Sequence, residues 1–321
     1  MRAPIRLIRG LGSCGIALAL SACAVVPQAA PGPGAQAGNA PEASTQPQIA
    51  RSVAVPEPEP RPEPTPAPGP PPEWTFEGEL IQGGYITGTV PDGTARAMLG
   101  EQELDIAEDG GFFAAFDRNS PAALALSAIL ESGDEIAETL TIAPRDWQIQ
   151  RVDVARRPSG SSAAFMKRRR PELEAIYTAR AQRTGASGWS EDFIWPVKGR
   201  ISGLFGRQRI YRGEPGSYHS GIDIAPGAGT PFVSPASGVV VLARTGFSLE
   251  GGLIIIDHGM GLNSAFLHAS RLVVEEGDRV EQGQHIGNVG ASGRATGPHL
   301  HWSLKWTDAR LDPLLIAGPM D

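Results

Sequence analysis

The last part of the chain is a series of short apolar runs separated by glycine-rich turns. The runs are GVVVLAR, LIIIDHG, SAFLHAS, HIGNVG and HLHWSLKW, and no long amphipathic helix lies between them. Short runs that are rich in Val and Ile and bounded by Gly are typical of β-strands. We therefore predict an antiparallel β-sheet domain over residues 189–321, which is long enough to enclose a hydrophobic core.

A second and shorter β pattern lies upstream. FEGELIQGGYITGTV contains strand-like runs broken by Gly-Gly, and PDGT, EDGGFF and ESGDE supply turn signals at intervals. This pattern predicts a small, sandwich-like all-β domain over residues 74–144. Acidic residues greatly outnumber basic ones there, and nothing in it identifies a catalytic group.

The connector between these domains, residues 145–188, is basic. Within it, FMKRRRPELEAIYTARAQR predicts a helix that begins near Pro171, because proline is tolerated in the first turn of a helix. Packing against the acidic β domain, or plain solvation, explains the basic run without nucleic acid as a partner. Contact with an anionic wall or membrane surface is the alternative.

The N-terminus has the pattern of an export signal. Arg2, Arg6 and Arg9 precede an apolar run over residues 11–22 that is too short to span a membrane. The run ends in Leu-Ser-Ala-Cys, which resembles a bacterial lipoprotein signal. The resemblance implies that residues 1–22 are a signal peptide and that Cys23 is the lipidated first residue of the mature chain.

The segment after Cys23 has a composition that cannot form a core. Residues 23–73 are nearly all Pro, Ala, Gly, Glu and Gln, and they hold about half of the 29 prolines. Such a composition predicts a disordered, extended linker. Because Ala24 is not an aspartate, the lipoprotein sorting pattern favours the outer membrane.

All six histidines lie after residue 218, in the last domain. In YHSGIDIAPGAGTP, His219 and Asp223 are an even number of residues apart and therefore share one face of an extended chain. An imidazole and a carboxylate on one face suit zinc or a similar ion. A surface ion pair is the alternative for this pair alone.

Two further histidine sites follow. In TGPHLHW, His299 and His301 share one face of a strand, and Leu300 points the other way into the core. Both imidazoles could reach one metal, or one could bind while its neighbour acts on the water. In FLHAS, His268 alternates with Phe266 and Ser270, and a lone histidine in such a strand is usually structural.

Taken together, the three sites closely resemble those of the M23 family of zinc peptidases, the lysostaphin or LytM type. The resemblance extends through WPVKGRISGLFGRQR, HSGIDIAPGAGTPFVSPASGVV, GGLIIIDHGMGL and EEGDRVEQGQHIGNVGASGRATGPHLHW. It implies a mainly β chain whose C-terminal domain is an antiparallel sheet of the barrel-sandwich hybrid-like type with a narrow groove. It also implies His219, Asp223 and His301 as zinc ligands, with His299 and His268 as catalytic histidines.

The chemistry of these residue types agrees with that assignment. Three protein ligands and one open position are typical of a catalytic zinc, which lowers the pKa of a water molecule to about 7. No Glu occupies a metal-motif position, so a neutral imidazole is the natural base. We assign this role to His299 and oxyanion stabilisation to His268, although the two roles could be reversed. His258 and His285 are interpreted as structural and surface residues.

The resemblance implies a zinc endopeptidase that cuts peptide cross-links of peptidoglycan. It would act in the periplasm of a Gram-negative cell, on a lipid tether, and an envelope or divisome regulator is a candidate partner. The alternative is a non-hydrolytic LytM-type protein that binds peptidoglycan and activates a cell-wall amidase. Regulators of that kind usually lack one or more of the motif residues, whereas this chain lacks none.

Overall fold

The computed structural model describes residues 71–155 and 162–320. The predicted signal peptide (1–22), the predicted lipidation site Cys23 and nearly all of the predicted linker (23–73) lie outside the described residues. All described residues belong to one compact unit, Ala67–Asp321.

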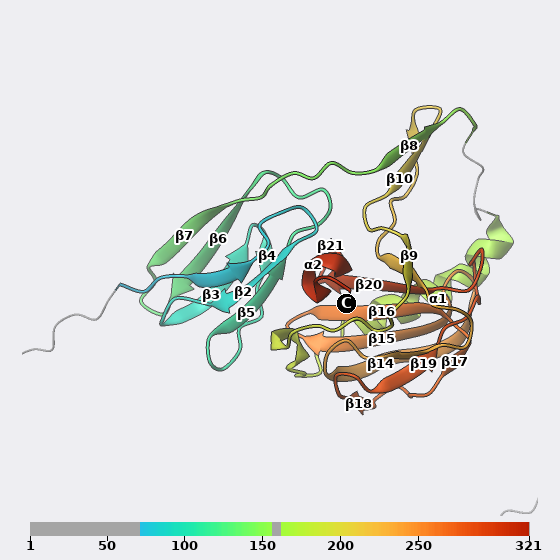
Figure 1. The fold of residues 1–321 in the computed structure, drawn as a ribbon. Helices are drawn as coiled ribbons and strands as arrows, with labels where there is room; N and C mark the ends of the chain where they lie inside the picture. The colour runs from blue at the N-terminus through green and yellow to red at the C-terminus, as the bar shows by residue number, and fades with distance from the viewer. Residues whose placement is uncertain (1–70, 156–161, 321) are drawn as a thin grey trace, which may run out of the picture. The chain divides into compact units, whose positions relative to one another are not determined.

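The first described domain consists of two small antiparallel sheets (Figure 1). One sheet has the strand order β1-β2-β5 and the other has the order β4-β3-β6-β7. Ile86, Phe112 and Leu126, from strands of both sheets, are fully buried in one core. The strands are β1 (Thr75–Gly78), β2 (Tyr85–Thr89), β3 (Thr94–Leu99), β4 (Gln102–Glu103), β5 (Gly111–Ala115), β6 (Ala123–Leu130) and β7 (Glu135–Thr141).

The connector contributes a strand and a long helix. Strand β8 (Ile149–Val152) pairs in parallel with β10 (Gln208–Tyr211), which itself pairs with β11 (Glu214–Pro215). Helix α1 (Ala163–Arg180) follows. The predicted start of this helix near Pro171 is wrong, because Pro171 lies inside it. Ser162 is the N-cap, and its side chain accepts a hydrogen bond from the backbone N–H of Phe165.

The last domain is built around one eight-stranded antiparallel sheet. Its order is β18-β14-β15-β16-β20-β12-β9, and β21 pairs with β20 outside this path. The strands are β9 (Arg200–Gly203), β12 (Ile222–Ala225), β14 (Gly238–Phe247), β15 (Gly251–Gly259), β16 (Leu262–Ala269), β18 (Arg279–Val280), β20 (Leu300–Trp306) and β21 (Ala309–Leu311). This main sheet carries all the residues of the candidate site on or next to its strands.

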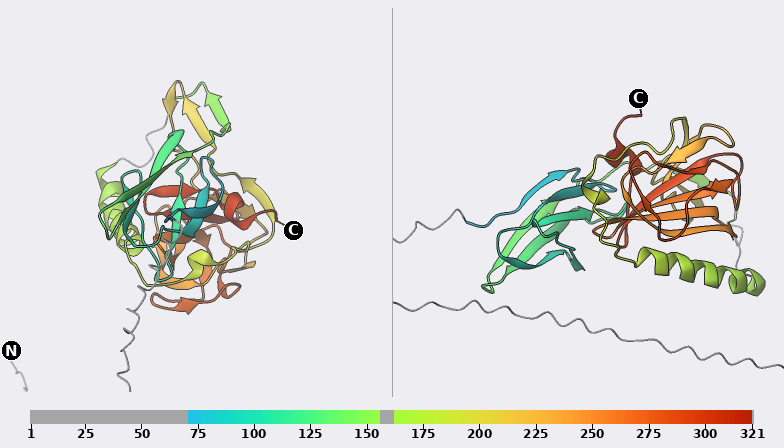
Figure 2. Two further views of the ribbon diagram at one scale, coloured as in Figure 1. Left: turned by 90° about the vertical axis from the view of Figure 1, so that its left-hand side faces the viewer. Right: turned by 90° about the horizontal axis from the view of Figure 1, so that it is seen from below.

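The two faces of the main sheet are covered differently. On one face, Leu300, Trp302 and Leu304 enter the large core, which also includes Phe232 and Ile286 of a small second sheet. The other face is covered by α1, as Figure 2 shows, and apolar side chains of β14, β15 and β16 pack against this helix. The second sheet has the order β13-β19-β17, formed by β13 (Pro231–Val233), β17 (Arg271–Leu272) and β19 (His285–Asn288). Two short helices complete the domain, η1 (Gly188–Ser190) and α2 (Pro313–Ala317).

The structure confirms the predicted fold class. The described chain is mainly β, with antiparallel sheets in both domains and a small sandwich before the main sheet. The prediction that Leu300 points into the core is also confirmed, since its side chain is fully buried. Among the described residues, no helix combines the length and the apolar character needed to cross a membrane.

Candidate metal centre

Three potential ligands meet where β12 and β20 run side by side. Asp223 on β12 lies directly opposite His301 on β20 in the antiparallel register. His219 precedes β12 in an irregular loop. The sequence analysis predicted that His219 and Asp223 share a face because both lie on an extended chain; the two side chains do lie together, but His219 is not part of a strand. The loop, rather than an alternating strand, brings the imidazole of His219 to the carboxylate of Asp223.

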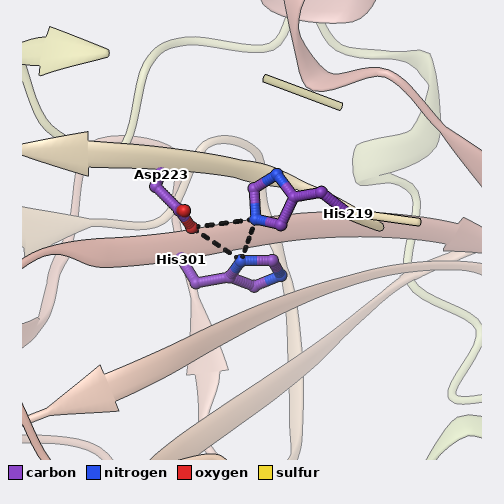
Figure 3. Close-up of side chains that lie close together, drawn as sticks. All are labelled: His219, Asp223 and His301. Atoms are coloured by element: carbon purple, nitrogen blue, oxygen red, sulfur yellow. Dashed lines mark hydrogen bonds and ion pairs between the residues drawn. The ribbon is translucent and has the colours of Figure 1, made fainter. Parts of the chain in front are cut away.

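The donor atoms of these three residues converge on a small space (Figure 3). Asp223 Oδ1 lies 3.0 Å from His219 Nε2 and 2.9 Å from His301 Nδ1. The two imidazole nitrogens are 3.1 Å apart. All three donor atoms lie within 4.8 Å of one another. Two nitrogen donors and one carboxylate oxygen in this arrangement form a set that can hold a metal ion.

His299 and His268 lie beside this cluster. His299 Nε2 is 3.7 Å from Asp223 Oδ1. The ring centroid of His268 is 4.7 Å from that of His299 and 6.4 Å from that of His301. All five residues predicted for the site are therefore brought together by the fold.

The position of His268 differs from the predicted alternation. Because Phe266 enters the core, simple alternation would send His268 into the core as well. The β15–β16 register shifts between Gly252 and Ile254, so two residues of β16 oppose one residue of β15. His268 itself has φ +68°, in the left-handed region. This β-bulge turns the imidazole toward His299.

Backbone carbonyls fix the tautomers of three of the four imidazoles. Nδ1 lies 2.9 Å from the carbonyl oxygen of Leu204 in His219, 2.8 Å from that of Ser292 in His268 and 2.9 Å from that of Gly297 in His299. A carbonyl oxygen only accepts, so each Nδ1 carries a proton and donates it. Each neutral ring then keeps its lone pair on Nε2, available to a metal or a proton.

The electrostatics of the cluster favour a charged carboxylate at Asp223 and shift the pKa values of His219 and His301 in opposite directions. Burial would raise the pKa of Asp223, but hydrogen bonds from His219 and His301 hold it well below its usual range. Burial lowers the pKa of His301, and the charge of His219 adds to this effect against the pull of Asp223. Burial also opposes the charge of His219, but its hydrogen bond to Asp223 outweighs burial and raises the pKa. An ionised carboxylate and a neutral imidazole are the forms that bind metals.

Comparison with known proteins places this site in a family. Residues 217–313, which include all the residues of the cluster, match the model of Peptidase family M23. Residues 217–313 are therefore the part of the chain that is similar to the M23 peptidases.

Several named proteins resemble this part of the chain. The chain is 40% identical over 116 residues to peptidoglycan DD-endopeptidase ShyA of Vibrio cholerae, covering 34% of this chain and 26% of that protein. It is 35% identical over 127 residues to lipoprotein NlpD/LppB homolog of Pseudomonas aeruginosa, and the match covers 40% of this chain and 39% of that protein. It is 32% identical over 129 residues to cell division protein DipM of Caulobacter vibrioides, and the match covers 40% of this chain and 20% of that protein. The chain thus matches well under half of the length of each relative.

One solved structure resembles more than the M23 domain. A crystal structure assigned to peptidase M23 from Pseudomonas aeruginosa has a TM-score of 0.57 and 27% sequence identity. The likeness covers 75% of this chain and 96% of that one. Since residues 189–321 are less than half of the chain, the shared fold includes the small β domain.

Two glycines that the sequence analysis did not single out are needed beside the metal centre. A Cβ atom on Gly203 would collide with the carboxylate of Asp223 and lie 3.0 Å from His219 Cε1. A Cβ atom on Gly221 would lie 2.8 Å from His301 Nε2 and would collide with the carbonyl of Trp302. The first glycine of SGLFG and the glycine of HSGID are the sequence features that could have indicated these positions. Their role is to let the backbone approach the ligands closely.

The small β domain contributes a buried arginine next to the M23 domain. Arg118 is only 6% exposed, and its Nε donates to the carbonyl of Gly206, 3.0 Å away. The N–H of Gly206 in turn donates to the carbonyl of His219. The guanidinium of Arg118 also lies 4.9 Å from the ring of Tyr218, whose hydroxyl bonds Asp117. The loop that carries a candidate metal ligand is therefore held by residues about 100 positions upstream.

The other two histidines lie outside the cluster. His258 is fully buried, and its ring contacts the Ser237 carbonyl through Nδ1 and the Ser264 hydroxyl through Nε2, both at 2.8 Å. His285 is exposed at the start of β19. These positions confirm the interpretation of His258 as structural and of His285 as a surface residue.

Proposed function

We propose that the protein is a zinc-dependent endopeptidase that hydrolyses peptide cross-links of peptidoglycan. The observation that carries this proposal is the convergence of His219 Nε2, Asp223 Oδ1 and His301 Nδ1, with two further imidazoles beside them. The similarity to relatives named peptidoglycan DD-endopeptidases supports the substrate class.

The donor set fits zinc. Two imidazole nitrogens and one carboxylate oxygen are zinc ligands, and a set of three protein ligands is typical of a catalytic site. The backbone carbonyl of Leu204 keeps the Nε2 lone pair of His219 pointed at the cluster. When bound there, zinc would act as a Lewis acid on the substrate carbonyl and lower the pKa of a water molecule to about 7.

His299 and His268 are proposed as the proton-transfer residues. His299 donates its Nδ1 proton to the carbonyl oxygen of Gly297, so its Nε2 can accept a proton from the attacking water. His268 has the same tautomer, and its Nε2 can hydrogen-bond a developing oxyanion only after it has gained a proton. We assign His299 as the base and His268 as the stabilising group, and the reversed assignment is the alternative.

The substrate has room beside His219. A cleft of about 1360 Å³ is lined by Arg207, Arg209, Tyr218 and Thr296 together with His219. Such a cleft suits an extended peptide. We further propose that Cys23 carries a lipid that tethers the protein to the outer membrane of a Gram-negative cell, on its periplasmic side. The Leu-Ser-Ala-Cys pattern and the similarity to a relative named a lipoprotein support this.

A non-hydrolytic regulator that binds peptidoglycan and activates a cell-wall amidase is the second candidate. The similarity to a protein named for cell division favours an envelope or divisome partner. The complete set of donors favours the enzyme, because a protein that only binds does not need three converging ligands beside two imidazoles.

The test measures zinc content and hydrolysis together. Purified protein is incubated with cross-linked peptidoglycan, and the products are identified by mass spectrometry. The matched variants are His301→Ala and, as a control, His285→Ala, which removes an exposed histidine outside the cluster. We expect cleaved cross-links that disappear with a chelator and in His301→Ala but persist in His285→Ala. Stoichiometric zinc without any cleavage, or no zinc at all, would favour the regulator.

A further inference from the structure

A second cavity lies on the far side of His301, between α1 and the main sheet. It has about 200 Å³ of space, which is much smaller than the cleft beside His219. The side chains of α1 form one wall, and residues of β15, β16 and β20 form the other. Its polar lining residues include Arg169, Arg180, His301, Ser303, Lys305 and Arg310.

Arg180, in the last turn of α1, is the exceptional group in this cavity. Its Nη1 is buried and has no hydrogen-bond partner among the described residues. Arg169, on the same helix, is fully paired, because it contacts both carboxylate oxygens of Glu250 at 2.6 and 2.7 Å and also bonds Glu172. A buried guanidinium nitrogen without a partner carries a large desolvation penalty. An anion in the cavity would remove that penalty.

The charges around the cavity also call for an anion. In the described ranges, neither Arg180 nor Arg310 belongs to an ion pair with a carboxylate, although Arg310 Nη1 donates to the Tyr218 hydroxyl, 3.3 Å away. Lys305 pairs with Asp308, whose side chain is 99% exposed and lies at the surface. Burial, followed by the charge of Arg310, lowers the pKa of Arg180 to about 10, so the side chain is still charged at neutral pH. Glu250 also lines the cavity, but Arg169 already binds both of its carboxylate oxygens, so the cavity holds an excess of positive charge.

The cavity shares a wall with the metal centre. His301 Nδ1 faces Asp223, while Nε2 on the opposite side of the ring points toward Gly221. A Cβ atom at position 221 would lie 2.8 Å from Nε2, so glycine there leaves room beside that side of the ring. Ser220 and Ser303 line the cavity together with His301. A group bound in the cavity thus contacts the ring of a candidate zinc ligand, His301, whose Nδ1 faces Asp223.

We propose that this cavity binds a free carboxylate of the peptide substrate, and that Arg180 is a specificity-determining residue. The inference rests on the proposed function. In a D-alanine to diaminopimelate cross-link, the carbon that bears the scissile nitrogen also bears a free carboxylate. A carboxylate so close to the scissile bond suits a small cationic cavity that adjoins the metal centre. Arg180, with Lys305 and Arg310, would bind it through charge-assisted hydrogen bonds.

The experiment compares two probes on matched variants. The probes are N-acetyl-D-alanyl-diaminopimelic acid, joined through the amino group of the D-centre, and the same peptide with the adjacent carboxylate converted to an amide. Arg180→Met removes the charge and keeps the apolar stem, and Arg180→Lys keeps a charge. Arg170→Met is the control, because Arg170 is an exposed arginine on the same helix. Binding is measured by calorimetry on chelator-treated protein, and KM and kcat are measured on zinc-loaded protein.

We expect Arg180→Met to weaken binding of the acid peptide by about 10- to 100-fold, which is typical of a hydrogen bond to a charged group. The change in zinc-loaded protein should fall on KM, with kcat nearly unaltered. The amide peptide should bind equally weakly to the original protein and to Arg180→Met. Arg180→Lys should recover part of the difference, and Arg170→Met should behave as the original protein does.

Two results would overturn the inference. One is equal weakening of both peptides by Arg180→Met, which would indicate a packing role; the other is unchanged binding. Thermal unfolding of each variant shows whether the helix is still docked. Carboxylate-selective binding without any cleavage would contradict the proposed function alone. Cleavage of acid and amide peptides at the same KM would contradict the carboxylate site alone.

Discussion

The two faces of the main sheet bury histidines in opposite ways. On the core face, both ring nitrogens of His258 are satisfied by protein groups, the Ser237 carbonyl and the Ser264 hydroxyl. On the other face, the rings of His219 and His299 have one nitrogen bound to a backbone carbonyl and turn the second toward Asp223. The difference lies in the partners of each nitrogen rather than in burial. A histidine with one nitrogen anchored and the other aimed at a carboxylate is available for chemistry.

Replacing Asp223 should have the largest effect. Asp223→Ala removes the only carboxylate of the donor set and leaves two imidazole nitrogens 3.1 Å apart. We expect loss of zinc and of all measurable hydrolysis, because removal of a ligand should exceed the roughly 10- to 100-fold loss of affinity that outer partners cause. Metal analysis and peptidoglycan digestion measure it. Asp192→Ala, at an exposed position, is the control. Zinc retained in Asp223→Ala would contradict the assignment of Asp223 as a ligand and the contrast between the two kinds of histidine.

Replacing His299 should separate metal binding from catalysis. His299→Ala leaves the three donor atoms in place and removes the proposed base, so zinc should stay bound. Hydrolysis should fall by about 10² to 10⁴, the usual contribution of a general base. Single-turnover digestion of zinc-loaded protein measures the loss. If His299→Ala hydrolyses at the original rate and His268→Ala does not, the two roles are reversed.

Replacing Arg118 should weaken the metal centre from a distance. Arg118→Ala removes the donor to Gly206 and the cation against the ring of Tyr218, next to His219. We expect zinc affinity to fall by roughly 10-fold, as for other outer partners, with kcat of zinc-saturated protein nearly unchanged. Competition with a chromophoric chelator measures affinity. Arg118→Lys, which keeps the charge, should recover part of the zinc affinity. Unchanged affinity in Arg118→Ala would show that the small β domain does not support the metal centre through Arg118.

Replacing His258 should affect stability and leave chemistry intact. Burial lowers the pKa of His258 to about 4, so the unfolded chain takes up a proton more readily than the folded one. Stability is therefore present above pH about 6.5 and is lost as pH falls toward about 4, by up to roughly 3 kcal/mol for this group. Denaturant unfolding of His258→Gln should show a shallower loss over this range, with zinc content and activity at neutral pH retained. An equally steep loss would contradict the assigned cause.

Local pattern was sufficient for much of the fold and for part of the site. Alternation in HLHWSLKW correctly separated His301 from Leu300 and Trp302, because β20 is a regular strand whose side chains alternate between the core face and the site face, although both faces are buried. The same rule fails at His268, where the bulge opposite the stretch between Gly252 and Ile254 and the positive φ turn the side chain to the other face. Bulges of this kind depend on the partner strand, which the sequence of FLHAS does not contain.

A missed local signal and long-range contacts account for the rest. The helix start was misplaced because Pro171 was preferred as a signal over Ser162, which caps the helix nine residues before the expected start. Arg118 carries no local sign of its role, since its partners Gly206 and Tyr218 follow much later in the chain. The pairing of Asp223 with His301 spans 78 residues and is fixed only when β12 and β20 come together.

The carbonyls of Leu204, Ser292 and Gly297 have a consequence for how the site can change. Because the groups that hold His219, His268 and His299 belong to the main chain, no exchange of a side chain deletes them. Substitutions of Leu204, Ser292 or Gly297 should be tolerated wherever the path of the backbone is unchanged. Inserting or deleting a single residue in the same loops would move a carbonyl and free an imidazole to rotate. The chemistry of the site is thus protected against replacement and vulnerable to changes in loop length.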